Sequence, residues 1–533
     1  MATEVTSPAE QPRLFTRNAT GLVRELSPFD AFNLVFSAVL IPVGITQVMG
    51  FAPQFWPHAN MLVAFAIATP LVGCFGLVYL YFTTLMPRSG GDYVWVSRTL
   101  HPSLGFIVNF SLTFVFLTWV AFNFTFMLSI VGPALGYVAG ISGDWINAPS
   151  KGEMMAVATV LTAAFAGLMV LGVRSVARYM RWTFALVWIG MAIWLVLMLF
   201  GSHAGFVSRW NAHAGQSYAS VIAQSKKLGF DAGGTIALGA TLAAMVYCFQ
   251  VYTGFQWTGY FAGEIKNARR TAVTSIVGGL LVAAFVYMLG AALIYKYYGF
   301  KFFGSVVFLG LGGGADHWHL AFTPYLPSMV NFLPGGSGLL GILVVGSFLL
   351  AIFWWTPTGF MLGTRNLFAW SFDRLAPTRL TDVSERFHTP VAATIVIALV
   401  IELLNYLNIY QGLGAFLLNI IAVMGSAFII VSIAAAIAPW HRASMHAGAP
   451  DWAKRKVLGA PVITLVAIVS GVSWGFVIYT ALHTGFGGEV GWKPMIKAFI
   501  APIIAVVWYV GVVVYRRSQG IQLANTFREI PPE

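Results

Sequence analysis

The stretch Phe36–Gln47, FSAVLIPVGITQ, interrupts an apolar window of membrane-spanning length with a proline and a glycine. Pro42 has no backbone N–H and its ring clashes with the preceding turn, so we expect the helix to break there. A membrane helix breaks only where its freed backbone groups face protein, water or a ligand. This stretch therefore predicts a binding site near the middle of the membrane.

A second stretch of the same kind is Tyr247–Gly259, YCFQVYTGFQWTG, the most polar interior stretch of any apolar window. The windows long enough to cross a bilayer lie at about 31–53, 60–86, 103–137, 153–173, 178–201, 235–262, 272–298, 338–370, 390–408, 412–438, 460–483 and 494–515. The two interrupted windows are the first and the sixth, so each begins a set of five, as in transporters built from inverted repeats. The sequence thus predicts an all-α polytopic membrane protein with 12 transmembrane helices.

Composition agrees with this prediction, because 58% of the residues are hydrophobic and 9% are charged, against roughly 25% charged in a soluble domain. No glycine-rich phosphate loop ending in Lys-Ser/Thr occurs, which argues against an ATP-driven pump. The one Gly-x-Ser-x-Gly match, Gly471–Gly475, lies inside a span rather than on a strand-to-helix turn. The only cysteines, Cys74 and Cys248, lie in apolar windows. We expect no enzyme activity, no metal site and no cofactor.

The formal charge of +12 reflects the placement of Lys and Arg in the links between spans. Most of them lie in links on the side that also holds both termini, and such links stay cytoplasmic. The basic balance therefore predicts a multi-pass protein of the cell membrane with cytoplasmic N- and C-termini. The bilayer is the expected partner and nucleic acid is not needed; no oligomeric state follows from the sequence.

The organisation predicted from these windows has six parts. They are a cytoplasmic tail at 1–28, a first repeat at 29–201, an extracellular loop at 202–234, a second repeat at 235–438, two further helices at 439–515 and a cytoplasmic tail at 516–533. The long link at about 299–337 contains an apolar stretch, 319–332, that is too short to span. We expect it to form a helix lying over the entrance to the site.

Three blocks in order resemble a known family. Met86–Tyr93, MPRSGGDY, is similar to the signature after the second helix of the amino acid-polyamine-organocation (APC) superfamily. Phe261–Arg270, FAGEIKNARR, and Thr364–Pro377, TRNLFAWSFDRLAP, resemble the segments at the ends of its helices six and eight. The resemblance covers roughly residues 28–440 and is to permeases of the amino acid type. It implies a leucine-transporter-like 5+5 inverted repeat plus two C-terminal helices, with substrate held between the unwound middles of helices one and six.

By position, the resemblance implies a set of substrate-binding residues. They are Ile41, Pro42, Gly44 and Ile45 on the carboxylate side, Tyr252, Thr253, Gly254, Phe255 and Gln256 on the amino-group and side-chain side, and Asn123 and Trp355 completing the pocket. The chain departs from the family's small-residue run in helix one, since Pro42–Ile45 contains a single glycine. A substrate other than an ordinary α-amino acid therefore stays open.

The expected coupling ion is Na⁺ or H⁺. Thr356 and Thr358 offer hydroxyls for Na⁺, and Glu402, the one acidic residue well inside a predicted span, offers a carboxyl for H⁺. Span five has no mid-span lysine of the kind that replaces sodium in some relatives.

The sequence thus predicts a secondary active transporter, a symporter or antiporter, that moves amino acids across the cytoplasmic membrane by alternating access. A polyamine or other organic-cation or nitrogenous-compound carrier of the same fold is the alternative within transport. Few membrane-embedded acids argue against strongly cationic substrates, which need a buried carboxylate. A non-transporting membrane sensor is the alternative from another class.

Overall fold

The computed structural model describes residues 26–232, 236–384, 386–387, 389–413, 420–484, 499–523 and 527. In these residues twelve helical segments are long and apolar enough to cross a membrane. The predicted all-α class with twelve spans is confirmed. Apart from its last residues, the predicted tail at 1–28 lies outside the described residues, as do parts of 202–234, 235–438, 439–515 and 516–533.

The spans follow the predicted windows closely. They are α1 (Pro28–Ser37) with α2 (Ile41–Phe55); α3 (Met61–Leu85); α5 (Pro102–Phe126) with η1 (Met127–Val131) and α6 (Gly132–Ala139); α8 (Lys151–Val170); α9 (Val173–Phe200); α12 (Leu238–Tyr252) with η2 (Phe255–Tyr260); α13 (Ala268–Val273) with η4 (Thr274–Gly278) and α14 (Gly279–Tyr298); α17 (Leu339–Phe372); α18 (Val391–Gln411); α20 (Ile420–His441); α23 (Val462–Thr484); and α25 (Ile500–Ser518).

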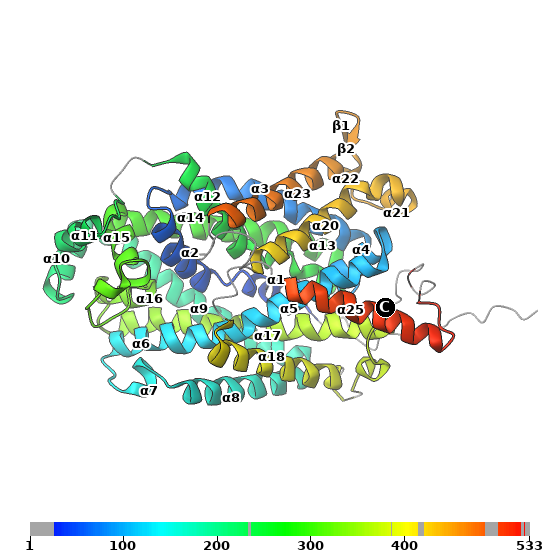
Figure 1. Ribbon diagram of the computed structural model, residues 1–533, viewed down its shortest axis with the longest axis horizontal. Helices are drawn as coiled ribbons and strands as arrows, with labels where there is room; N and C mark the ends of the chain where they lie inside the picture. Colours follow the sequence, from blue (N-terminus) through cyan, green and yellow to red (C-terminus); the bar gives the residue numbers. More distant parts are fainter. Residues whose placement is uncertain are drawn as a thin grey trace, which may run out of the picture.

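Short elements join the spans. They are α4 (Asp92–Thr99), α7 (Asp144–Asn147), α10 (His203–His213), α11 (Tyr218–Lys227), η3 (Ala262–Glu264), α15 (Phe300–Leu311), η5 (Ala315–His317), α16 (Leu326–Met329), η6 (Val330–Phe332), η7 (Thr378–Thr381), α21 (Ala443–Ala447), α22 (Asp451–Lys454) and the hairpin of β1 (Lys456–Val457) with β2 (Ala460–Pro461). Figure 1 shows α10, α11, α15 and α16 at one end of the bundle and α4, α21 and α22 at the other.

The end that carries α4, α21 and α22 is called the N-terminal end below, because α1 starts there. Across the bundle, α8 packs on α18, and α5 packs on α17. These are spans four and nine, and spans three and eight, so members at equivalent places in the two sets of five meet one another.

The link between spans seven and eight differs from expectation. A full helix over 319–332 was predicted, but only α16 and η6 form there, and the longest helix of the link is α15, before that stretch. Pro324 and Pro327 explain the difference, since each lacks an N–H and restricts the residue before it.

Candidate functional site

The first span breaks where the sequence predicts. α1 ends at Ser37, and Leu40 adopts a left-handed conformation with φ 47° before α2 begins. Pro42 lies in the first turn of α2, where its missing N–H costs nothing. The N–H groups of Ala38, Val39 and Leu40 bond carbonyls of the last turn of α1. The break is therefore a compact turn rather than an open loop.

The sixth span breaks at Thr253 and Gly254, between α12 and η2. Gly254 has φ +131°, a backbone conformation that residues with a side chain rarely adopt. A Cβ at this position would lie 2.5 Å from the carbonyl carbon of Ala38 and 2.7 Å from the nitrogen of Val39. The two breaks thus touch backbone to backbone, and glycine is needed for both the φ angle and the contact.

Tyr287 of α14 forms hydrogen bonds to both breaks. Its hydroxyl lies 3.1 Å from the carbonyl oxygen of Val39 and 3.3 Å from that of Val251, and the ring is fully buried. Gly44 makes room for it, since a Cβ at this position would lie 2.2 Å from the hydroxyl oxygen. The single O–H of Tyr287 is therefore shared between carbonyls of both interrupted spans.

We expect Tyr287→Phe to lower stability by about 1–3 kcal/mol, because it leaves buried carbonyls without a donor. Gly44→Ala should be destabilising through overlap with the same hydroxyl, so the double variant should lose less than the sum of the two single variants. Thermal unfolding of the purified variants checks this expectation; strictly additive losses would contradict it.

A cavity of about 70 Å³ lies at the two breaks. Its lining is Ala38, Val39, Leu40, Val43, Gly44 and Gln47 from the first span, Phe116, Trp119 and Asn123 from α5, Gln250, Val251, Thr253 and Trp257 from the sixth, and Trp355 from α17. Among the residues that the structure describes, no charged side chain lines this cavity. Its size suits a small ligand rather than a drug-sized one, which needs roughly 300 Å³ or more.

Two polar atoms of this lining are buried without a hydrogen-bond partner, the side-chain oxygen of Asn123 and the indole nitrogen of Trp257. The first is an acceptor and the second a donor. Buried polar atoms are normally paired, so the Asn123 oxygen and the Trp257 nitrogen are an acceptor and a donor that each have capacity for a further hydrogen bond.

Four of the sequence-predicted residues line the cavity: Gly44, Asn123, Thr253 and Trp355. Ile41 and Pro42 form the first turn of α2 beside it, and Gly254 forms the contact between the breaks. The side-chain amide oxygen of Gln256 accepts a hydrogen bond of 2.7 Å from the N–H of Gly254. Gln256 thus stabilises the break in the sixth span, although it is not itself part of the cavity lining.

Three predicted residues face other helices. Ile45 packs toward Gly290 of α14. The Tyr252 hydroxyl lies 2.9 Å from that of Thr69, and Phe255 packs edge-on against Phe75, both on α3. These side chains fix the interrupted spans against their neighbours.

The predicted ion-coupling residues lie in three different surroundings. The Thr358 hydroxyl lies 2.7 Å from that of Ser37 and donates to the Leu34 carbonyl, so it joins α17 to the end of α1. Thr356 donates to Ile352 of its own helix. Glu402, on α18, accepts hydrogen bonds from Thr159 of α8 and from Asn405. Glu402 does not line the cavity.

Sequence reasoning missed most of the aromatic lining, above all Phe116, Trp119 and Trp257. A signal for two of them exists, because Phe116, Trp119 and Asn123 follow i, i+3, i+7 spacing and so share one face of α5.

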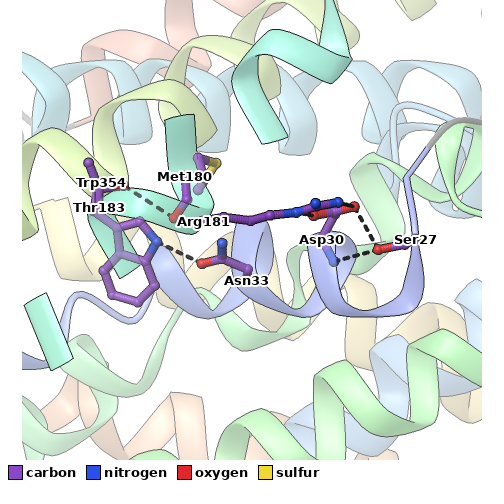
Figure 2. Close-up of polar contacts among 7 residues, drawn as sticks. All are labelled: Ser27, Asp30, Asn33, Met180, Arg181, Thr183 and Trp354. Atoms are coloured by element: carbon purple, nitrogen blue, oxygen red, sulfur yellow. Dashed lines mark hydrogen bonds and ion pairs between the residues drawn. The ribbon is translucent and has the colours of Figure 1, made fainter. Parts of the chain in front are cut away.

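Ion pairs join the spans at the N-terminal end of the bundle. Arg181 of α9 bonds Asp30 of α1 at 2.6 and 2.8 Å, as Figure 2 shows. Ser27 caps the same helix, donating to Asp30 at 2.6 Å and accepting from its N–H. Further along α1, Asn33 accepts from the indole N–H of Trp354 of α17 at 2.8 Å (Figure 2).

A second pair joins Arg365 of α17 to Glu264 of η3, with both side chains at most 4% exposed. A third joins Arg98 of α4 to Asp373 at 2.7 Å. Leu26 also bonds the segment after the sixth span, through its N–H to the Glu264 carbonyl and its carbonyl to the Lys266 N–H. Together these contacts hold the half-spans at this end against one another.

Two broken spans around a small cavity, in a bundle of twelve candidate membrane spans, are the features of secondary membrane transporters. The sequence model of the family described as "Amino acid permease" matches residues 37–524, and the chain belongs to this family, as the three sequence blocks predict. The protein is a membrane transporter and not an enzyme.

Two relatives from Bacillus subtilis (strain 168) are similar along most of their length. The branched-chain amino acid permease BcaP is 24% identical over 514 residues, covering 93% of this chain and 94% of its own. The methylthioribose transporter is 24% identical over 491 residues, covering 87% of this chain and 92% of its own.

Proposed function

We propose that this protein carries a compact, apolar amino acid into the cell by ion-coupled alternating access, with both termini in the cytoplasm. The observation that carries the proposal is the uncharged cavity at the two breaks, apolar except for a few amides and hydroxyls and the unpaired atoms of Asn123 and Trp257. An ammonium group donates to an acceptor and a carboxylate accepts from a donor, so the two unpaired atoms suit a zwitterion.

The apolar lining supports an apolar side chain on that zwitterion. Val39, Val43 and Val251 contribute aliphatic surface, and none of the described residues that line the cavity is a carboxylate that could pair a second positive charge. The printed name of one relative, a branched-chain amino acid permease, agrees with this class of substrate. The basic links between spans support the orientation with cytoplasmic termini.

Aromatic rings favour a second candidate, an organic cation. Phe116, Trp119, Trp257 and Trp355 all line the cavity, and such rings attract cations through their faces. The amino acid remains the primary proposal because it uses the unpaired donor of Trp257 as well as the acceptor of Asn123.

The test is thermal stabilisation of the purified protein by leucine, valine and phenylalanine, by charged amino acids and by quaternary amines, followed by uptake of the best ligand into proteoliposomes. A ligand at 100 times its Kd should stabilise the native state by about 2.7 kcal/mol. Stabilisation by apolar amino acids supports the proposal. Stabilisation by amines alone would contradict it and favour an organic cation as the substrate.

Asn123→Leu should weaken binding of the amino acid about tenfold, or ~1.4 kcal/mol, because the acceptor for the ammonium group is lost. Thr118→Val is the matched control, since its hydroxyl bonds only the Phe114 carbonyl of the same helix α5. Calorimetric titration measures both. Equal affinities for Asn123→Leu and Thr118→Val would remove Asn123 from the site.

A further inference from the structure

Asp92, the first residue of α4, is completely buried at the N-terminal end of the bundle. Its carboxylate accepts hydrogen bonds from three elements. The donors are the Tyr79 hydroxyl of α3 at 3.0 Å, the side-chain amide nitrogen of Asn109 of α5 at 2.7 Å, and the Tyr260 hydroxyl of η2. One carboxylate therefore gathers α3, α5 and η2 around the start of α4.

All three donors are neutral. Arg98, the cation on the same helix, is turned to Asp373, and the Tyr93 hydroxyl also donates to Asp373. The titratable groups that face Asp92 are Tyr79 from α3 and Tyr260 from η2, while α20, which also packs on α4, brings Phe428 against the Tyr79 ring. Among the described residues, Asp92 forms no ion pair.

A buried carboxylate without a cation holds its charge weakly, because it has given up hydration. Burial raises the pKa of Asp92 to about 6, although the hydrogen bonds from Tyr260, Asn109 and Tyr79 oppose the rise. The folded protein thus takes up a proton at Asp92 at a higher pH than an exposed aspartate does.

The same residue is connected to the substrate cavity through η2. Trp257 of η2 lines the cavity, and Tyr260 ends this short helix three residues later. The Tyr260 carbonyl accepts from the Gly90 N–H at 3.4 Å, and its ring lies where a Cβ on Gly91 would be only 2.9 Å away. Gly90 and Gly91, which precede α4, therefore pack directly against η2, the half-span next to the cavity.

We propose that Asp92 is a proton-binding site of this transporter, and that its ionised carboxylate, held by Tyr79, Asn109 and Tyr260, keeps the N-terminal end closed until it takes up a proton. This inference rests on the proposed function and names H⁺ as the coupling ion. The Glu402 carboxyl, which bonds Thr159 of α8 and Asn405 of its own helix α18, is a separate group that this proposal does not use.

The mechanism follows from the hydrogen bonds. The ionised carboxylate accepts from all three donors, and such charge-assisted bonds are roughly twice as strong as neutral ones. When a hydronium ion gives its proton to one carboxylate oxygen and leaves as water, an O–H bond forms and the negative charge is lost. That oxygen now donates a hydrogen bond, and the carboxyl accepts from its neighbours only through the weaker, neutral bonds. The hold on Tyr260 weakens, η2 separates from α4, and the proton leaves to water once the N-terminal end opens.

The test is the rate at which a thiol reagent, applied from the N-terminal side, labels a cysteine at position 258. Thr258 is fully buried in η2 between Trp257 and Tyr260, so Thr258→Cys, in a Cys74→Ala/Cys248→Ala background, is reachable only when this end opens. Labelling, corrected for the ionisation of the thiol, should be at least about tenfold faster at about pH 5 than at about pH 8. Asp92→Asn should give fast labelling at both pH values.

Tyr260→Phe is the second variant, which keeps the carboxyl and removes one donor to its ionised form. The midpoint of the pH profile should move to higher pH, because the ionised form has lost a bond. Tyr81→Phe is the control: its hydroxyl, also on α3, bonds His446 instead, and its profile should match the parent. A pH-independent parent, or an unchanged midpoint in Tyr260→Phe, would overturn the proposal.

This readout requires no transported substrate. Failure of the labelling experiment therefore rejects the proton site and leaves the amino acid proposal standing. Failure of every amino acid to bind rejects the substrate class and leaves the labelling result intact.

Discussion

Gly254→Ala is expected to reduce transport to background. The φ of +131° alone costs an L residue about 1–3 kcal/mol, and the new Cβ would lie 2.5 Å from the backbone of Ala38. Backbone of a packed break cannot move aside as a flexible side chain does, so the first and sixth spans must separate where they meet. Uptake into proteoliposomes, together with thermal unfolding of the purified variant, measures the effect.

Gly346→Ala is the matched control. Gly346 lies in α17 of the same bundle, and a Cβ there would have no heavy atom within 4 Å. Its uptake and unfolding temperature should stay close to the parent values. A Gly254→Ala protein that transports like Gly346→Ala would show that the contact between the breaks is not required.

The sequence was sufficient to predict the spans and both breaks, because each follows from local chemistry. Apolar length identifies a span. Pro42 is tolerated only in the first turn of a helix, and Gly254 permits the positive φ of the second break. The prediction of a helix over 319–332 was wrong for a related reason: the apolar content suggested a helix, but Pro324 and Pro327 limit it to α16 and η6.

The cavity lining was harder to predict, since it depends on how each half-span is rotated. Tyr252 and Thr253 are adjacent in sequence, yet Thr253 lines the cavity while the Tyr252 hydroxyl reaches Thr69. After Gly254 the chain continues as the 3-10 helix η2, which places Trp257 at the cavity and Phe255 against α3. The hydrophobic periodicity of the sequence does not predict this change from an α-helix to a 3-10 helix.

The role of Asp92 was hidden for a different reason. The sequence places it in a polar link beside Arg88 and Arg98, where an exposed carboxylate is the ordinary expectation. Its burial comes from tertiary packing of α3, α5 and η2, and its three donors lie far apart in the chain. The convergence of these three donors on Asp92 is visible only in the folded protein, where it shows a buried carboxylate held by neutral groups.

Arg365→Ala is expected to lower the free energy of unfolding by about 3–5 kcal/mol, since it leaves the Glu264 carboxylate buried without its partner. The exposed pair of Lys454 with Asp451 is the natural control, with side chains 39% and 93% exposed, and Lys454→Ala should change stability by less than about 0.5 kcal/mol. The double variant Glu264→Gln/Arg365→Met should be more stable than Arg365→Ala, because it removes the unpaired charge.

Denaturation in mixed detergent micelles ranks the stabilities of Arg365→Ala, Lys454→Ala and the double variant. If Arg365→Ala were as stable as Lys454→Ala, the pair would contribute nothing to holding α17 against η3, and other contacts at the N-terminal end, such as those of Asp30, Asp92 and Asp373, would hold the spans together there.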